Sequence, residues 1–165
     1  AKLVEMDREA GKIVELPELV ESEVLGREEG RWRTVRVEEL KPGDELGYVV
    51  DITAQSFQDP AVHQAIQSAE TIFVNAVMGF TPHFTDGSRA LDTTIDENRH
   101  AIKLYGGGDT LQEFKDLNPG LYLSVQDNAD YYFFTGGGSV LKAIEQGSPY
   151  GLEPVEALLE SSGRE

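Results

Sequence analysis

Short apolar runs alternate with amphipathic segments from Gly47 to the end of the chain. The apolar runs predict strands at residues 48–52, 71–74, 101–105 and 131–134. Strands of this kind, nearly continuous in apolar residues, are typical of a parallel sheet that helices cover on both faces. The pattern therefore predicts an α/β fold, a three-layer α/β/α arrangement around a mainly parallel sheet.

The segments between these strands predict helices with recognisable starting residues. A proline or a short polar residue precedes the longer apolar stripes, as is usual at helix N-termini. The expected helices start at Asp59–Pro60, begin after Thr85 or Asp86, and cover 110–117, 140–145 and 155–159.

The first part of the chain has a weaker pattern. Residues 1–10 resemble the end of a helix that stops at Gly11, and residues 12–16 predict a strand. Residues 18–30 are acidic and interrupted by glycines, so we expect a loop there with a short strand within 19–24. The sequence is least informative in this part.

An edge strand is expected at residues 32–37, where apolar and polar side chains alternate. Arg31, Arg33 and Arg36 form a short basic cluster at this strand, but acidic residues surround them. We expect these arginines to form local ion pairs rather than a binding patch for nucleic acid.

Composition and charge narrow the classes of function. The 165 residues suffice for one domain with a core, and the formal charge of −16 argues against a nucleic-acid or anionic-membrane partner. No apolar run approaches the roughly 20 residues of a membrane span. The absence of cysteine excludes disulfides and thiolate metal sites and agrees with a cytoplasmic location. A salt-adapted source would also explain the acidity.

Two glycine triplets each stand between a predicted strand and a predicted helix. Glycine takes positive φ readily and lets a ligand approach the main chain, while N–H groups at a helix start favour negative charge. The pattern therefore predicts a phosphate site at these turns. Its residues are Gly106, Gly107, Gly108, Asp109 and Thr110 in the first turn and Gly136, Gly137 and Gly138 in the second.

Asn75 follows the strand predicted at 71–74, so it stands at the same end of the sheet as the two turns. Ligands of parallel sheets bind beyond the carboxyl ends of the strands, so Asn75, Gly106 and Gly136 should line one crevice. Asp109 is a candidate ligand for a divalent cation that bridges phosphate oxygens. The alternative is that Asp109 only caps the helix. Two triplets at equivalent points favour the phosphate or nucleotide interpretation.

Other groups fit this chemistry less well. A phosphoryl-transfer enzyme needs cations near the transferring group, but Lys103 and Lys142 are interpreted as solvated surface lysines. Of the three histidines only His83, in the loop after Asn75, could face the crevice. The aromatic run 131–134 is interpreted as sheet core rather than as a stacking platform.

Five segments, in this order, resemble the C-terminal part of phosphoglycerate kinase. They are 71–79, 87–91, 106–110, 135–138 and 154–158. Segments 13–17 and 47–52 are similar to further stretches of that family, so the resemblance extends over the whole chain. It implies one partial domain, residues 1–165, from the nucleotide-binding lobe of a two-lobed kinase that exchanges a phosphoryl group between ATP and 3-phosphoglycerate.

The resemblance also implies roles for the site residues, with Mg²⁺ and ATP or ADP as cofactors. Asp109 would take the magnesium-linked aspartate role, and Asn75 would lie against the nucleotide near its phosphates. Gly106–Gly108 and Thr110 would contact the nucleotide, and Gly136–Gly138 would face the transferring phosphoryl group.

The chain departs from the family pattern in the loop 76–84. Ala76 and Val77 replace a Gly-Pro pair, and the loop has no glutamate to hold the ribose hydroxyls. The family's phosphate-binding lysines, adenine-side glycines and phosphoglycerate lobe would all precede Ala1. We therefore expect an inactive isolated chain whose partner is the missing N-terminal portion.

Two other interpretations stay open: a non-catalytic remnant that acts as a scaffold or interaction module, and transfer to a different acceptor. A partial lobe would also expose a sheet edge and an apolar face. We therefore expect the isolated chain to self-associate.

Overall fold

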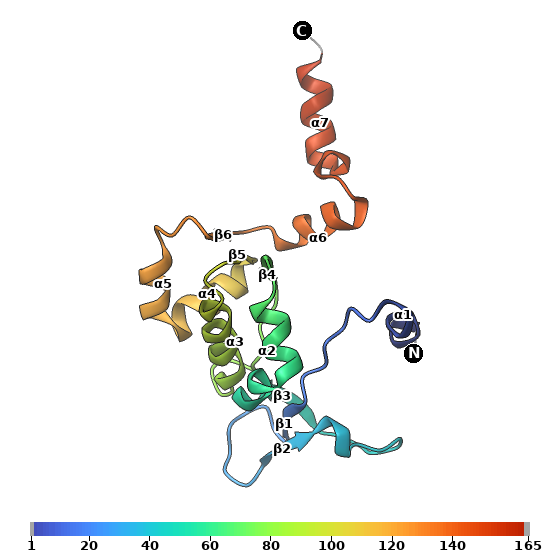
Figure 1. The fold of residues 1–165 in the computed structure, drawn as a ribbon, viewed down its shortest axis with the longest axis vertical. Helices are drawn as coiled ribbons and strands as arrows, with labels where there is room; N and C mark the ends of the chain where they lie inside the picture. Colours follow the sequence, from blue (N-terminus) through green and yellow to red (C-terminus); the bar gives the residue numbers. More distant parts are fainter. Residues whose placement is uncertain (1, 164–165) are drawn as a thin grey trace.

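The computed structural model describes residues 2–163, which form one antiparallel and one parallel three-stranded sheet (Figure 1). The strands are β1 (Glu18–Ser22), β2 (Trp32–Arg36), β3 (Tyr48–Ile52), β4 (Thr71–Val74), β5 (Ile102–Gly106) and β6 (Tyr131–Phe134). The helices are α1 (Lys2–Ala10), α2 (Pro60–Gln67), α3 (Asp86–Glu97), α4 (Gly108–Leu117), α5 (Pro119–Val125), α6 (Gly137–Gln146) and α7 (Glu153–Ser162), with short 3-10 helices η1 (Val37–Glu39), η2 (Ala54–Gln58) and η3 (Pro149–Gly151).

The parallel sheet has the strand order β4-β5-β6, with Val74 opposite Tyr105 and Gly106 opposite Phe134. Helices α3, α4 and α5 lie below this sheet in Figure 1 and close the main core. The predicted α/β class, with a parallel sheet flanked by helices, is therefore confirmed. The buried residues of this core are Val74, Ile95, Tyr105, Phe114, Val125 and Tyr131.

The alternation of side chains along β6 divides the aromatic run between two faces. Tyr131 is buried in the core and Phe133 packs against it, as predicted. Tyr132 is 52% exposed, and the Phe134 ring stacks on that of Phe73, with their centroids 6.0 Å apart. The prediction of core is therefore correct for only half of the run, because successive residues of a strand point to opposite faces.

The first part of the chain folds differently from the prediction. Residues 12–16, predicted as a strand, are irregular and largely exposed. The segment predicted as a loop contains β1, which is the central strand of the antiparallel sheet β2-β1-β3. β3 was expected to continue the parallel series but pairs antiparallel with β1, because Val50 and Val20 share a small second core with Phe84.

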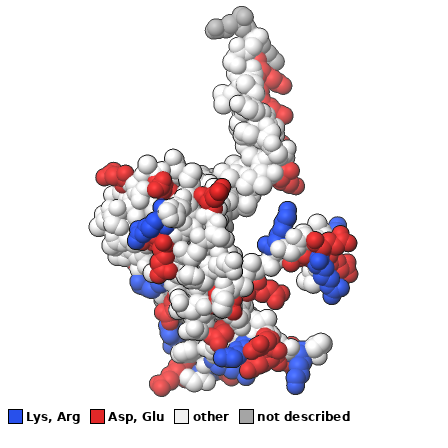
Figure 2. Space-filling model, in the orientation of Figure 1, with Lys and Arg blue, Asp and Glu red and all other residues white. Residues whose placement is uncertain are grey.

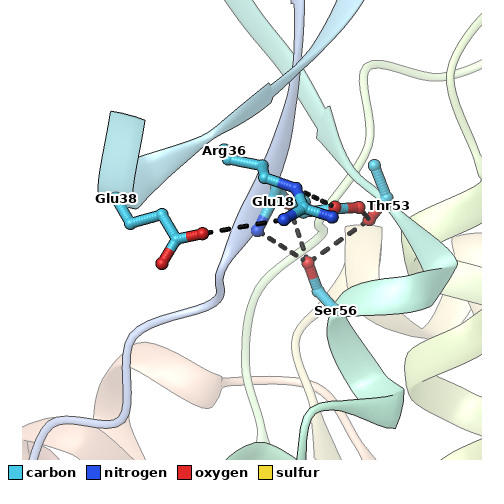
Figure 3. A network of polar contacts seen from close by, with 5 residues as sticks. All are labelled: Glu18, Arg36, Glu38, Thr53 and Ser56. Atoms are coloured by element: carbon cyan, nitrogen blue, oxygen red, sulfur yellow. Dashed lines mark hydrogen bonds and ion pairs between the residues drawn. The ribbon is translucent and has the colours of Figure 1, made fainter. Parts of the chain in front are cut away.

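Ion pairs link the side chains of neighbouring strands β1 and β2 in this antiparallel sheet. Arg33 contacts Glu21 at 2.6 Å and Arg36 contacts Glu18 at 3.3 Å, so the predicted local pairing of the arginines is confirmed. Figure 3 shows how Glu18 also ties the sheet to η2, because the Ser56 hydroxyl donates to the Glu18 carbonyl oxygen at 2.8 Å. This network fixes the sheet against the segment that leads into α2.

Both ends of the described chain extend away from this body (Figure 1). α1 and α7 contain no buried residue. Ala1, at which the first predicted helix begins, lies outside the described residues. Among residues 2–163, no helix has the length and apolar character needed to cross a membrane.

Candidate functional site

The two glycine turns meet at the carboxyl end of the parallel sheet. β5 ends at Gly106 and α4 begins at Gly108, while β6 ends at Phe134 and α6 begins at Gly137. The Gly107 N–H donates to the Phe134 carbonyl oxygen at 3.0 Å, so the first turn is hydrogen-bonded to the end of the strand that leads into the second turn. The structure therefore places two helix N-termini side by side, each with N–H groups that have no partner within the helix.

Asn75 lies between the two turns, as predicted for a residue that follows a neighbouring strand. A Cβ atom at Gly137 would overlap the Asn75 Oδ1, and one at Gly107 would lie 3.2 Å from it. The side chain of Asn75 therefore occupies space that only glycine leaves free. This arrangement brings Asn75, the first turn and the second turn into one site.

Two glycines of the site have backbone conformations that other residues rarely adopt. Gly107 has φ of 108° and Gly136 has φ of 83°, and they are the N-cap residues of α4 and α6. Gly106 is required for a different reason, because a Cβ there would lie 2.8 Å from the Phe73 ring and 2.9 Å from the Phe134 ring. The glycines of the two triplets are thus needed both for positive φ angles and for close packing.

Asp109 and Thr110 follow in the first turn of α4. Asp109 is exposed, and no side chain caps α4. Asp109 is therefore not a helix cap, which was the alternative interpretation of this residue. Thr110 is 7% exposed and its Oγ1 lies near the Cβ position of Gly107. Among the hydrogen bonds and ion pairs within residues 2–163, none uses the Asp109 carboxylate, which is available to a ligand.

The donor set fits a magnesium ion only together with phosphate. Residues 2–163 contain no group of three or more acidic or histidine side chains able to hold a metal. Mg²⁺ in nucleotide sites typically takes one or two carboxylates and completes its shell with phosphate oxygens and water. Asp109 can supply that one carboxylate, beside N–H groups suited to phosphate.

The buried carboxylate of Asp92 binds the residue just before the first turn and the residue that ends α4. Tyr105 donates a hydrogen bond to Asp92 Oδ1 at 3.2 Å, and Asn118 donates to Asp92 Oδ2 at 2.7 Å. Burial raises the pKa of Asp92 to about 7, more than these donors lower it. Asp92 was not predicted from the sequence, although an acidic residue one turn before Ile95 on the buried face of α3 is a signal of such a role.

The carboxylate of a residue on α4 contacts the loop 76–84. The Thr81 hydroxyl donates to Glu113 Oε1 at 3.1 Å, and the Ser88 hydroxyl accepts from the Gly79 N–H at 3.2 Å. Burial raises the pKa of Glu113. The loop itself contains no acidic residue, and Glu113 was not predicted to contact it because Glu113 stands on α4, one helical turn after Asp109.

The two lysines near the triplets lie in different environments. Lys103 was interpreted as a surface lysine, but it is 2% exposed, donates to the Ala101 carbonyl oxygen at 2.9 Å and lies over the Tyr131 ring. That prediction is wrong, because β5 is the central strand and Lys103 points to the helix-covered side. Lys142 is on the surface, as predicted, paired with Glu145 at 2.8 Å.

Two further features lie apart from the glycine turns. His83 is exposed. Its carbonyl oxygen, rather than its imidazole ring, accepts a hydrogen bond from Arg27 at 3.3 Å. A cavity of about 760 Å³ opens beside the network of Figure 3. Its Arg36 already pairs with Glu18 and Glu38, so this cavity does not offer an unmatched cation to a phosphate.

Comparison with known proteins assigns this chain to a family. The family model described as phosphoglycerate kinase matches residues 1–147. The chain belongs to the phosphoglycerate kinase family. The resemblance identified in the sequence is thereby confirmed, and the glycine turns, Asn75 and Asp109 all lie within the matched part.

Individual phosphoglycerate kinases agree with this assignment. That of Chlamydia trachomatis serovar L2 is 30% identical over 124 residues, which cover 74% of this chain and 28% of the relative. That of Dictyoglomus turgidum is 32% identical over 104 residues, which cover 62% of this chain and 24% of the relative. The chain thus spans less than a third of the length of these curated relatives.

The phosphoglycerate kinase structure from Coxiella burnetii has a similar fold. It superimposes with a TM-score of 0.61 at 18% identity and covers 89% of this chain. The match takes up 35% of the Coxiella chain, so it shows that this chain has the fold of part of that structure.

Proposed function

We propose that this chain is the magnesium–nucleotide-binding part of a phosphoglycerate kinase that transfers a phosphoryl group between ATP and 3-phosphoglycerate. The observation that carries the proposal is the meeting of two helix N-termini around Asn75, with the exposed carboxylate of Asp109 beside them. Membership of the family supports the same assignment.

Each part of the site has a proposed role that follows from its chemistry. The N–H groups of Gly108 and Thr110 and the amide of Asn75 hold phosphate oxygens, and Asp109 holds the metal. Gly106 and Gly107 shape the turn that presents these groups to the nucleotide. Gly136–Gly138 face the phosphoryl group that is transferred. When bound, Mg²⁺ supplies positive charge that offsets the charge of the phosphate oxygens.

The isolated chain is proposed to bind nucleotide without turning it over. Lys103 and Lys142 are engaged elsewhere, so neither supplies the cation that phosphoryl transfer needs. The acceptor site and the remaining cations are proposed to lie in parts of the enzyme outside this chain, and those parts are its proposed partner. Glu113, the carboxylate that contacts the loop 76–84 through Thr81, is our candidate for the ribose contact.

Isothermal titration with MgADP and with magnesium pyrophosphate tests the site. Asp109→Asn is expected to weaken MgADP binding about tenfold or more, which corresponds to about 1.4 kcal/mol. Asp116→Asn is the matched control, because Asp116 is exposed at the far end of the same helix. If Asp109→Ala or changes in the glycine triplets leave the MgADP affinity of the full-length parent unchanged, the assignment is wrong.

The second candidate is a non-catalytic remnant that serves as a scaffold, and the changed loop 76–84 favours it. A coupled assay of the full-length parent separates the two candidates, since ATP-dependent turnover of 3-phosphoglycerate excludes the remnant. The absence of cysteine supports a cytoplasmic location for either.

A further inference from the structure

A polar cluster lies inside the chain beside the first turn of α4. Asp92 on α3 is 6% exposed and Thr110 on α4 is 7% exposed. Together with Ser88 and Glu113 they line a cavity of about 10 Å³, which has room for about one water molecule. The walls of this cavity come from the segment 74–78, from α3 and from α4. Asp92 and Thr110 are therefore buried by this chain alone.

Asp92 links the two ends of the segment that carries the first turn. Tyr105, which donates to Asp92, is the residue before Gly106, and Asn118, which also donates to Asp92, ends α4. Asp92 therefore fixes the start and the end of α4 relative to α3. The N–H groups proposed to hold phosphate stand at the start of this helix.

These hydrogen bonds are compatible with both protonation states of Asp92. As a carboxylate, Asp92 accepts from Tyr105 and from Asn118. As a neutral acid, it can donate to the Tyr105 oxygen, since a hydroxyl accepts as well as donates, and still accept from Asn118. A change of charge at Asp92 therefore leaves α4 in place and alters the electrostatic field beneath the phosphate site.

We propose that Asp92 is a positioning residue for the phosphate-binding end of α4, and that phosphate binding there is coupled to uptake of a proton by Asp92. This inference rests on the function proposed above. A buried negative charge beside the start of α4 opposes a bound phosphate, because water and salt screen a buried charge only weakly. The neutral form of Asp92 is therefore the form that favours the bound nucleotide.

The protonation state of Asp92 changes within an accessible pH range. Burial raises the pKa of Asp92 to about 7, and the charge of Glu113 adds to this rise, while the hydrogen bonds from Asn118 and Tyr105 oppose it. Asp92 is therefore mostly neutral at pH 6 and mostly ionised at pH 8. The nucleotide affinity should accordingly fall as pH rises through 7.

The other titratable or charged groups around α3 are bonded to partners other than Asp92. Arg89 donates to the Leu117 carbonyl oxygen, the Tyr131 hydroxyl donates to Asp96, Asp51 accepts from the Gly87 N–H, and His63 pairs with Glu97. The pH dependence is therefore assigned to Asp92, with Glu113 and Tyr105 as its titratable neighbours.

The exposed carboxylates of the chain also repel an anionic ligand. Figure 2 shows acidic side chains over the outside of the molecule, with a row along α7, and the formal charge is −16. Salt screens these exposed charges much more than it screens the buried Asp92. Binding is therefore measured at about 0.3 M salt, where the contribution of the exposed charges is small.

Isothermal titration of the 165-residue chain with MgADP at several pH values tests the coupling. Asp92→Asn keeps both hydrogen bonds but cannot ionise, and the protons of ADP itself are the same for both proteins. The MgADP affinity of the wild type relative to Asp92→Asn should be near one at pH 6 and about three- to tenfold lower at pH 8. Asp116→Asn, on the exposed side of α4, is the matched control and should follow the wild type.

Proton uptake is measured in the same experiment. Titrations at pH 7 in two buffers of different ionisation enthalpy should show that the wild type takes up more protons on binding than Asp92→Asn does. Asp92→Leu, which loses the hydrogen bonds as well as the charge, should weaken MgADP binding at least threefold at every pH. Circular dichroism checks that each variant is folded.

Two neighbours of Asp92 should move the midpoint of the pH dependence in opposite directions. Glu113→Gln removes a nearby negative charge and should move the midpoint to lower pH. Tyr105→Phe removes a donor to the carboxylate and should move the midpoint to higher pH. A purely structural role of Asp92 predicts neither shift.

The proposal is wrong if the wild type and Asp92→Asn lose affinity equally between pH 6 and pH 8. It is also wrong if Asp92→Asn weakens binding as much as Asp92→Leu at every pH, which would leave Asp92 a structural role only. Failure of the proposed function gives a different result, because then neither the wild type nor any variant binds MgADP at any pH.

Discussion

The two glycine turns have similar sequences and equivalent positions, but they use their glycines differently. In the first turn the second glycine, Gly107, has positive φ and caps the helix. In the second turn the first glycine, Gly136, has that role. The turns are therefore offset by one residue, so equal motifs do not place equal demands on equal positions.

The close contacts differ in the same way. In the first turn Gly106 makes room for the rings of Phe73 and Phe134, and in the second turn Gly137 makes room for Asn75. Only the third glycines are equivalent, because a Cβ at Gly108 or Gly138 would meet nothing within 4 Å. The tightest contact of the first turn is therefore with aromatic side chains of the sheet, and that of the second turn is with a polar residue of the site.

The largest expected effect comes from Gly137→Ala. The new methyl group would overlap Asn75 Oδ1, so one of the two must move, at a cost of about 2–4 kcal/mol in the free energy of unfolding. Asn75→Ala in the same chain should recover about 1–2 kcal/mol of it. Urea unfolding of the two single variants and the double variant measures this coupling. A cost below about 0.5 kcal/mol would contradict the close contact.

The second effect concerns Asp92, which supports only the first turn. Its pKa is raised to about 7, so the stability supplied by its protonated form is complete below about pH 4 and lost as pH rises through 7. Asp92→Asn removes this loss and should raise the free energy of unfolding by about 1–3 kcal/mol at pH 8, with little change at pH 4. Urea titrations across this pH range measure it. Asp116→Asn, on the exposed surface, should not alter the profile.

The third effect concerns the two capping glycines. Gly107→Ala and Gly136→Ala each force a positive φ on a residue with a Cβ, which should cost about 1–2 kcal/mol. Thermal unfolding of both variants measures the cost. If neither substitution lowers the stability against thermal unfolding, the two glycines do not have positive φ in solution.

The smallest effect is expected at the third glycines. Gly108→Ala and Gly138→Ala should change the free energy of unfolding by less than about 0.5 kcal/mol, or stabilise slightly, because both begin helices in open space. These two variants are the controls for the two predictions above that change glycines of the turns. A large loss of stability at Gly108 or at Gly138 would show that this glycine does not lie in open space, so the third glycines of the two turns would not be equivalent.

Much of the local structure was determined by the sequence alone. The strands at 71–74 and 131–134 and the helix starts at Pro60 and Asp86 follow from side-chain period and from residues that favour helix N-termini. The same holds for the two glycine turns, whose position between strand and helix is a local property. The family motifs were visible for the same reason, since each is a short contiguous stretch.

Only the tertiary structure decided how these parts combine. Side-chain period reports that a strand exists but not which strand it pairs with, so β3 was assigned to the wrong sheet. The burial of Lys103 and the place of Glu113 beside Thr81 likewise depend on neighbours far away in the sequence. The contact between Asn75 and Gly137 joins residues 62 positions apart, and no local pattern records which glycine of a triplet such a contact requires.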